Sequence, residues 1–294
     1  VALYRIRSTF GRRWAGYLSL VVLVGLVGGL GLGSLAAARR TQSSFSTFLA
    51  ATNPSDLLVS VYSGNSVASD NPIYSPRLTQ AIARLPGVLH VAPGLEVTGA
   101  PLTADGSPRI SVTGLAFPVA SVNGLFFTQD RMAVTEGRLA SPRRPNEIMM
   151  APAVAKLLRL HVGEAIPFGF YSTVQQSLAG FGTKAVPPAI RMNMKLVGLV
   201  SLNSEIVQDD VDVLPTFLPL TPAFTADLLA HKGESFTGAL TFGIRTRGGT
   251  SAVSAVEREV ARLIPPGVIS TDHLLAPVVD KADRSLKPIS IALG

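Results

Sequence analysis

The chain has 294 residues, of which 47% are hydrophobic and 15% are charged, and it contains no cysteine. The lack of cysteine excludes a disulfide framework, a thiolate metal site and a cysteine nucleophile. The net charge of +7 comes from one end: residues 1–40 hold six arginines and no acidic residue, and the other 20 basic residues face 19 acidic ones. This distribution is typical of the flanks of a membrane segment and argues against a nucleic-acid-binding surface.

An uncharged run occupies residues 14–38. As an α-helix it would be about 37 Å long, which exceeds the roughly 30 Å of a bilayer core, so we predict a transmembrane helix. Aromatic residues at one end and arginines at both ends are typical anchors at the membrane interface. The predicted anchors are Arg12, Arg13, Trp14, Tyr17, Arg39 and Arg40.

The short basic segment 1–13 precedes this run, and we expect it to lie as an amphipathic helix on the inner membrane surface. Four arginines precede the run and two follow it, so the positive-inside rule predicts a cytoplasmic N-terminus and an extracytoplasmic location from residue 41 onward. A cleaved signal peptide is the alternative, because residues 36–38 give an A-x-A pattern. The run is longer than the apolar core of about 7–15 residues in a signal peptide, which favours a retained span.

Gly25, Gly29 and Gly33 recur at every fourth position of the run, so in a helix they share one face. Small residues at this spacing allow another membrane helix to approach closely. We therefore predict that the three glycines form a helix-packing groove. The alternative interpretation is that glycine is frequent in membrane helices generally.

Residues 41–280 predict a mixed α/β domain outside the membrane. Apolar runs bounded by turn residues indicate strands, and apolar residues at helical spacing indicate helices. Residues 169–193 are rich in Gly, Ser, Gln and Pro and read as an excursion, so an inserted subdomain is expected at about 169–235. The expected strands are 55–64, 88–100, 109–116, 148–150, 165–168, 194–201, 235–249 and 267–271, and the expected helices are 75–87, 151–160, 221–233 and 250–267.

The clearest of these helices is 250–267, because its apolar residues fall on one face. After the last strand, a polar helix is expected, and then the apolar run 286–294. We expect this run to be the start of a second transmembrane helix, with the chain continuing and the domain strung between two spans. The apolar face of helix 250–267 is formed by Ala252, Val253, Val256, Val260 and Leu263.

Catalytic motifs do not occur in the sequence. There is no P-loop, no G-x-S-x-G elbow and no metal-ligand spacing among the four histidines. The acidic cluster at 208–213 lacks the register of an EF-hand and indicates a solvated loop. Residues 270–273 place Ser, Asp and His side by side, but geometry rather than sequence adjacency makes a triad. We therefore expect no catalytic residue, no metal site and no cofactor on this chain.

Two stretches resemble a known family. The first, LAAARRTQSSFSTFLAATNPSDLLVS at 35–60, leaves the membrane through Arg-Arg-Thr and soon reaches a strand. The second is EGRLASPRRPNEIMMAPAVAKLLRLHVGEAIPF at 136–168, followed by MKLVGLVS at 194–201. Gly-Arg-x-hydrophobic, an acidic residue before a strand, a helix ending in Leu, and Val-Gly-Glu before the next strand resemble the FtsX-like and MacB-like permease subunits of ABC transporters. The layout matches over about the whole chain and the motif over about sixty residues, and segment 170–191 departs from it.

The resemblance implies an α+β protein in which a transmembrane helix precedes a MacB-like periplasmic core domain. It implies a permease subunit that is not itself an enzyme and that works with a separate ATPase subunit, which binds ATP and Mg. A second permease copy or a homologous permease, membrane lipid and an extracytoplasmic partner protein are the other implied partners. Arg5 and Arg7 would lie near the ATPase, with the principal coupling segments on cytoplasmic loops beyond Gly294.

The implied activity is export of a lipophilic or peptide substrate, or mechanical signalling across the membrane, driven by the partner's ATP hydrolysis. Two alternatives remain at this point. One is a single-span anchored binding or scaffold protein, which needs no ATPase. The other is a relay that regulates a cell-wall-remodelling enzyme, which needs the ATPase but transports nothing.

Overall fold

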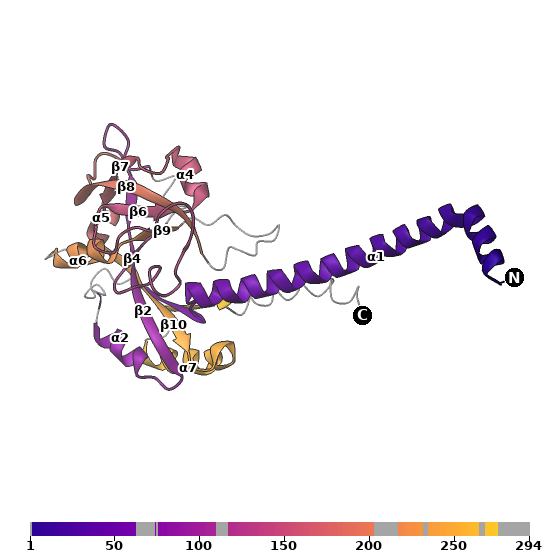
Figure 1. The fold of residues 1–294 in the computed structure, drawn as a ribbon. Coiled ribbons are helices and arrows are strands. Elements are labelled where there is room, and N and C mark those ends of the chain that lie inside the picture. The colour runs from indigo at the N-terminus through magenta and orange to yellow at the C-terminus, as the bar shows by residue number, and fades with distance from the viewer. Residues whose placement is uncertain are drawn as a thin grey trace. The chain divides into compact units, whose positions relative to one another are not determined.

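The computed structural model of the chain describes residues 2–62, 74, 76–109, 117–202, 217–231, 235–264 and 268–275. The chain divides into two units, Val1–Phe48 with Lys281–Gly294, and Leu49–Asp280. The predicted fold class is confirmed for the described residues, which form a long N-terminal helix and a mixed α/β domain (Figure 1). The expected start of a second span at 286–294 lies outside the described residues.

Helix α1 (Ala2–Thr52) is one continuous helix of 51 residues. It contains the whole predicted span and continues past Arg39 and Arg40, because no proline or glycine occurs between residue 34 and its end. It ends at Thr52, and the next residue, Asn53, has a left-handed φ of 54°. Asparagine tolerates this conformation, and the proline that follows disfavours a helical residue before it.

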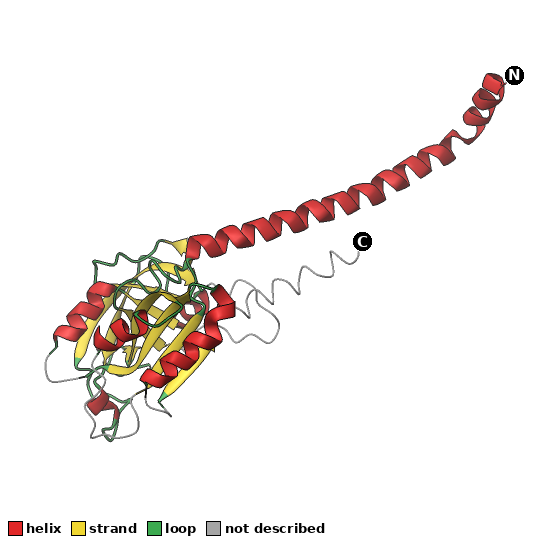
Figure 2. Ribbon diagram, turned by 90° about the horizontal axis from the view of Figure 1, so that it is seen from below, coloured by secondary structure: helices red, strands yellow, loops and turns green. Residues whose placement is uncertain are grey.

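One sheet organises the second unit, and eleven of its strands lie among the described residues (Figure 2). The order is β11-β1-β10-β2-β4-β9-β6-β8-β7-β3, with β5 beside β8. Most neighbours are antiparallel, and β4–β9 and β6–β8 are parallel. The strands are β1 (Leu57–Tyr62), β2 (Val88–Val97), β3 (Gly99–Pro101), β4 (Phe117–Ser121), β5 (Ala133–Gly137), β6 (Glu147–Met150), β7 (Ala165–Phe170), β8 (Ile190–Ser201), β9 (Phe217–Leu220), β10 (Thr237–Thr246) and β11 (Ile269–His273).

Helices follow the strands in both halves of the sheet. Proline at the first position of several of them suits a helix start, where its missing N–H is not needed. Helix α6 is capped by the Thr221 hydroxyl, which accepts a hydrogen bond from the Phe224 amide at 3.2 Å. The helices are α2 (Pro76–Ala83), α4 (Pro152–Leu158), α5 (Thr173–Gln176), α6 (Pro222–Ala230) and α7 (Val253–Leu263), preceded by the 3-10 turn η2 (Gly249–Ala252).

The two faces of the sheet are covered differently. On the first face, alternate residues of β1 such as Leu57 and Val59 join a large core with Ile82 of α2 and Val256 of α7. On the second face, a smaller core forms around Leu125. Residues 122–132, which we call the covering segment, lie over this smaller core. The covering segment contains no helix and no strand, and it lies across β2 and β10.

The strand and helix predictions are confirmed for most elements, with two corrections. Strands β4, β5 and β9 were not predicted, because β4 and β9 contain proline and β5 is largely exposed and polar. On α7 the buried residues are Val253, Val256 and Val260, but Leu263 is 42% exposed, and Ile264 beyond the helix is buried instead. The expected strand 109–116 lies almost entirely outside the described residues.

Strands β7 and β8 flank the segment expected to be an excursion, and the inserted subdomain at about 169–235 stays a prediction. Strand β7 continues to Phe170 and β8 begins at Ile190, and the two pair along their length in the main sheet. Within residues 169–235, β8, β9 and α6 all contribute to the same unit.

Candidate functional site

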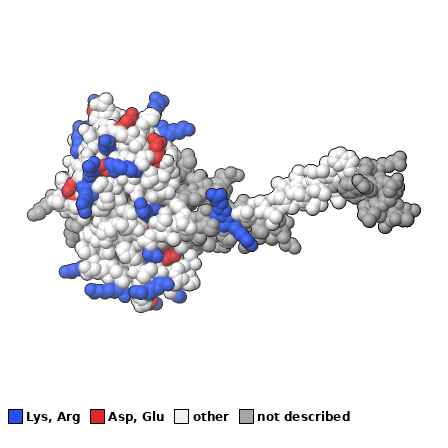
Figure 3. All heavy atoms as spheres, viewed as in Figure 1, with Lys and Arg blue, Asp and Glu red and all other residues white. Residues whose placement is uncertain are grey.

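The apolar run of α1 has the length and composition of a membrane span. Residues Trp14–Ser34 have a mean hydropathy of 2.1, and among the described residues this is the only helix segment that qualifies. Its large side chains are exposed on every side, with Leu32 at 72%. In the space-filling view the described part of this run is uniformly white, without a charged side chain (Figure 3). A helix that is apolar all round needs an apolar environment to cover it.

The three predicted packing glycines lie in this exposed run. A Cβ added at Gly25, Gly29 or Gly33 would meet nothing within 4 Å. The face that they share is therefore open, as a groove for another helix requires, and their role stays a prediction.

The predicted interface anchors and contact residues all lie on α1. Trp14 is 58% exposed, and Arg39 and Arg40 are exposed. The side chains of Arg5, Arg7, Arg12, Arg13 and Tyr17 lie outside the described ones.

The end of α1 is held by the covering segment, at a place that we call the junction (residues 49–56 with 128–131). The last turn of α1 belongs to the same unit as the sheet. Carbonyl oxygens of Thr52 and Asn53 accept hydrogen bonds from the amides of Arg131 and Asp130, at 2.7 and 3.1 Å. The Asn53 side-chain amide donates to the carbonyl of Thr128 at 3.0 Å. Main-chain groups left without partners at the helix end are thus satisfied by a segment about 75 residues away in the chain.

A buried side-chain network continues the junction into the sheet. Asp130 accepts hydrogen bonds from the amide and the hydroxyl of Ser55, at 2.7 and 2.5 Å. The side-chain nitrogen of Gln129 donates a hydrogen bond to the Ser55 hydroxyl at 2.7 Å and another to the carbonyl of Gly243, on β10, at 2.8 Å. Because this nitrogen is the donor, the Gln129 oxygen accepts from Nδ1 of His90, at 2.6 Å. The end of α1, the covering segment and strands β2 and β10 are therefore tied by one hydrogen-bonded network.

Burial dominates the electrostatics of this network. Asp130 is 6% exposed, and loss of hydration raises the pKa of its carboxyl above the ordinary value. The hydrogen bonds from Ser55 and the charge of Arg245 oppose the rise, and the charge of Asp56 adds to it.

Glycine allows the covering segment to lie directly on the sheet. A Cβ at Gly243 would come within 2.7 Å of the Ser55 hydroxyl and 2.9 Å of the Leu125 side chain. A Cβ at Gly94, on β2, would come within 2.8 Å of the same leucine. The approach that builds the junction thus depends on the absence of side chains at two positions.

A cavity of about 200 Å³ lies beside the junction. Most of its wall is apolar, and two carboxylates, Asp130 and Glu96, reach it. Phe126 of the covering segment also lines it and holds a left-handed φ of 70°. A bulky residue in this conformation is strained. The apolar wall is made by Pro54, Leu58, Val119, Phe126, Leu202, Leu274 and Leu275.

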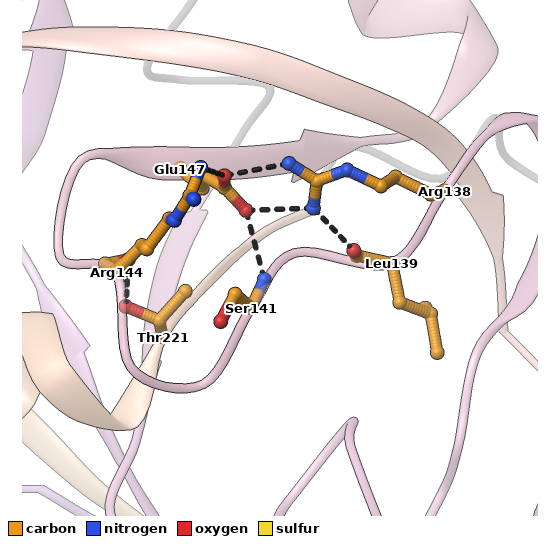
Figure 4. Close-up of polar contacts among 6 residues, drawn as sticks. All are labelled: Arg138, Leu139, Ser141, Arg144, Glu147 and Thr221. Carbon is orange, nitrogen blue, oxygen red and sulfur yellow. Dashed lines mark hydrogen bonds and ion pairs between the residues drawn. The ribbon is translucent and has the colours of Figure 1, made fainter.

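A second buried carboxylate, Glu147 at the start of β6, lies at the centre of a cluster of polar contacts (Figure 4). Arg138 binds it through two nitrogens, at 2.6 and 2.8 Å, and Arg144 through one, at 3.1 Å. The Ser141 amide adds a hydrogen bond at 2.8 Å. These donors, led by Arg138, lower the pKa of Glu147 to about 2. The acidic residue before a strand and the Gly-Arg pair of the resemblance motif are therefore partners in one ion pair.

Sequence reasoning did not identify the junction residues. Asn53, Ser55, Gln129 and Asp130 are polar residues in turns, which usually face water. A signal was present in Asn53-Pro54, because this dipeptide marks the end of a helix. Nothing local pairs Ser55 with Asp130, since the contact spans 75 residues.

The sequence features set aside for catalysis have ordinary partners where the structure describes them. On β11, His273 bonds to Glu257 of α7 at 3.0 Å, and not to Ser270. The acidic cluster 208–213 lies outside the described residues. In the part of the chain that the structure describes, no three His, Asp or Glu side chains gather as metal ligands would.

No protein-family model and no curated protein matches this sequence. Solved structures do resemble it. The periplasmic region of MacB from Actinobacillus actinomycetemcomitans is 10% identical, with 81% of this chain and 95% of that chain covered and a TM-score of 0.40. The extracellular domain of the noncanonic ABC-type transporter YknZ from Gram-positive bacteria is 11% identical, with 74% and 99% covered and a TM-score of 0.40.

This chain is thus similar in structure to domains of the kind that its sequence resembles, the extracytoplasmic domains of MacB and YknZ. The function proposed below rests on the geometry of α1 and the junction.

Proposed function

We propose that this protein is a permease subunit of an ABC transporter of the FtsX-like or MacB-like type. In this proposal α1 crosses the membrane with its N-terminus in the cytoplasm, and the α/β domain lies outside. A separate ATPase subunit binds ATP and Mg and hydrolyses the ATP. The motion of α1 transmits this work to the outer domain, which exports a lipophilic or peptide substrate or acts on an extracytoplasmic partner protein.

One observation carries the proposal: α1 is uninterrupted from the apolar run to the junction, where its last turn is hydrogen-bonded to the covering segment. A simple anchor needs a hydrophobic span but gains nothing from a helix that continues without a break to the domain. A helix that relays movement needs both, because a flexible linker would absorb the displacement. The buried network of Ser55, Gln129 and Asp130 stiffens the point at which the displacement would enter the sheet.

The proposal includes a second partner besides the ATPase. A single ATPase-driven relay works against a second transmembrane body, so a second permease copy or a homologous permease is part of the proposal. The open glycine face of α1 is suited to contact that body. The basic residues Arg5 and Arg7 would lie on the ATPase side of the membrane.

Purification from native membranes tests the proposal. We expect an ABC-type ATPase to co-purify with the protein in a fixed ratio and to hydrolyse ATP in the purified complex. Recovery of the protein with no ATPase would contradict the proposal and favour the anchored scaffold. Recovery with an active ATPase, together with a wall-remodelling enzyme, would keep the coupling and replace export by the relay function.

The glycine groove gives a narrower prediction. Replacing Gly29 by Leu would fill the groove and is expected to reduce recovery of the second permease body several-fold in mild detergent. Val27→Leu is the matched control, because at about 100° per residue position 27 lies nearly opposite position 29. Equal recovery with both variants would show that this face does not pack against another helix.

A further inference from the structure

The cavity beside the junction has room for a small organic molecule. Its volume is about 200 Å³. An engineered apolar cavity of about 150 Å³ in another protein stays dry and binds benzene. The cavity can therefore hold one aromatic ring or a comparable aliphatic group together with a short polar extension.

The wall of the cavity specifies an apolar body. Leu58 on β1, Phe126 on the covering segment and Leu274 after β11 contribute to it from three separate elements. Apolar pockets with a few convergent polar groups are the usual form of small-molecule sites.

The polar groups of the wall indicate the charge that a bound molecule should carry. Asp130 is buried, and its bonding partners are the amide and hydroxyl of Ser55. Glu96 accepts a hydrogen bond from the Thr241 hydroxyl at 3.0 Å. Among the described residues, neither carboxylate has an ion-pair partner within 4.0 Å. This contrasts with Glu147, which is surrounded by arginine nitrogens.

We infer that the cavity binds a small amphiphilic amine, with its protonated nitrogen between Asp130 and Glu96 and its apolar body against Leu58 and Phe126. An ammonium group supplies the donors and the charge that the two carboxylates lack. A neutral isostere would leave them unneutralised, and an anion would be repelled. The inference is independent of the proposed function, since it needs no ATPase and no transport.

The binding would depend on pH. Burial holds the pKa of the Asp130 carboxyl above its ordinary value, and the ammonium binds the ionised form. Affinity is therefore expected to rise as the pH rises through that raised pKa. The charged groups that act on Asp130 are Arg245, which opposes the cation, and Asp56, which favours it. The other carboxylate at the cavity is Glu96. His90 reaches Asp130 only through Gln129 and Ser55.

Equilibrium dialysis of the full chain in lipid nanodiscs tests the inference, with empty nanodiscs to subtract partition into lipid. The probes are 2-phenylethylamine, 2-phenylethanol and phenylacetate, which share a ring and differ in charge. We expect the amine to bind at least about tenfold more tightly than the other two, the effect of one charge-assisted hydrogen bond. Equal binding of the three probes, or no binding of the amine above that of empty discs, would overturn the inference.

Variants locate the binding. Glu96→Gln keeps an acceptor for Thr241 and is expected to weaken amine binding about tenfold. Leu58→Phe narrows the cavity without changing its charge and is expected to weaken binding. Glu136→Gln removes an exposed carboxylate on β5, away from the cavity, and is the control with unchanged affinity. Unchanged affinity in both Glu96→Gln and Leu58→Phe would overturn the site even if the amine binds.

Discussion

Two buried carboxylates, Glu147 on β6 and Asp130 on the covering segment, have opposite environments. Glu147 receives two arginines and a main-chain amide, and its pKa falls to about 2. Asp130 receives only the amide and hydroxyl of Ser55, and burial raises its pKa. Both side chains are nearly inaccessible to solvent. The arginine hydrogen bonds outweigh the cost of burial at Glu147, whereas burial outweighs the Ser55 hydrogen bonds at Asp130.

The comparison indicates that the two carboxylates have different roles in the domain. The Glu147 cluster holds the loop before β6 in place and is a closed structural unit with its charge neutralised. The Asp130 network joins α1 to the sheet and keeps a carboxylate without a cation, next to a cavity. Groups with perturbed pKa values cluster at functional sites.

The largest expected effect is the loss of the Glu147 ion pair. Glu147→Gln removes the charge that Arg138 and Arg144 bind, and the shift from a pKa of 4.5 to about 2, discounted for two half-exposed arginines, predicts a loss of about 2–3 kcal/mol in the free energy of unfolding. Urea unfolding followed by near-UV circular dichroism measures it. The control is Glu259→Gln, which breaks the exposed pair with Arg262 and is expected to cost less than about 0.5 kcal/mol. Equal losses would mean that the buried pair is worth no more than a surface pair.

A slightly smaller loss of stability is expected at Gly243 on β10, which the Asp130 network contacts. Gly243→Ala places a methyl group against Ser55 and Leu125, and overpacking of this kind costs about 2 kcal/mol. Gly238→Ala is the control on the same strand, because its Cβ would meet only a carbonyl oxygen at 3.8 Å. Thermal unfolding of the two variants compares them. A Gly243→Ala protein as stable as the control would show that the covering segment does not press on β10.

The smallest expected effects are changes of stability with pH, which have opposite signs for Glu147 and Asp130. The folded-state pKa of Glu147 is depressed, so its contribution to stability is complete above pH 4.5 and is lost as the pH falls toward 2. The folded-state pKa of Asp130 is raised, so its contribution is complete below its ordinary value of 3.8 and is lost as the pH rises through the raised pKa. The cost of Glu147→Gln should therefore shrink from pH 5 to pH 2, whereas Asp130→Asn should flatten the decline at higher pH. Urea midpoints across this range check both slopes, and a Glu147→Gln cost that is constant with pH would contradict the first.

The sequence predicted what local pattern can specify. The uncharged run of α1, the apolar spacing of α7 and the strands around Gly163 all follow from residues that are neighbours in the chain. Strands β4 and β9 were not predicted because proline breaks the pattern by which strands are recognised. The acidic residue before β6 was noted as part of a motif, but its bond to Arg138 needed the fold.

The junction could not be predicted for a different reason. Its bonds join Ser55 to Asp130 and Gln129 to Gly243, across 75 and 114 residues. Each of these residues is unremarkable in its own stretch. Gly94 and Gly243 gave the nearest signal, since glycine inside a strand often marks a close backbone approach, but it does not say which segment approaches.

Hydrogen exchange at the junction tests the central claim, that α1 relays work from a partner ATPase to the outer domain. The amides of Ser55, Asp130 and Arg131 report on it, because each donates a hydrogen bond across the junction. In the purified membrane complex we predict that their exchange rates change when ATP is added. Ser44→Pro, which breaks α1 before the junction, should abolish the change, and Ser44→Ala should preserve it. Exchange that ignores ATP, or that responds equally in the proline variant, would contradict the relay.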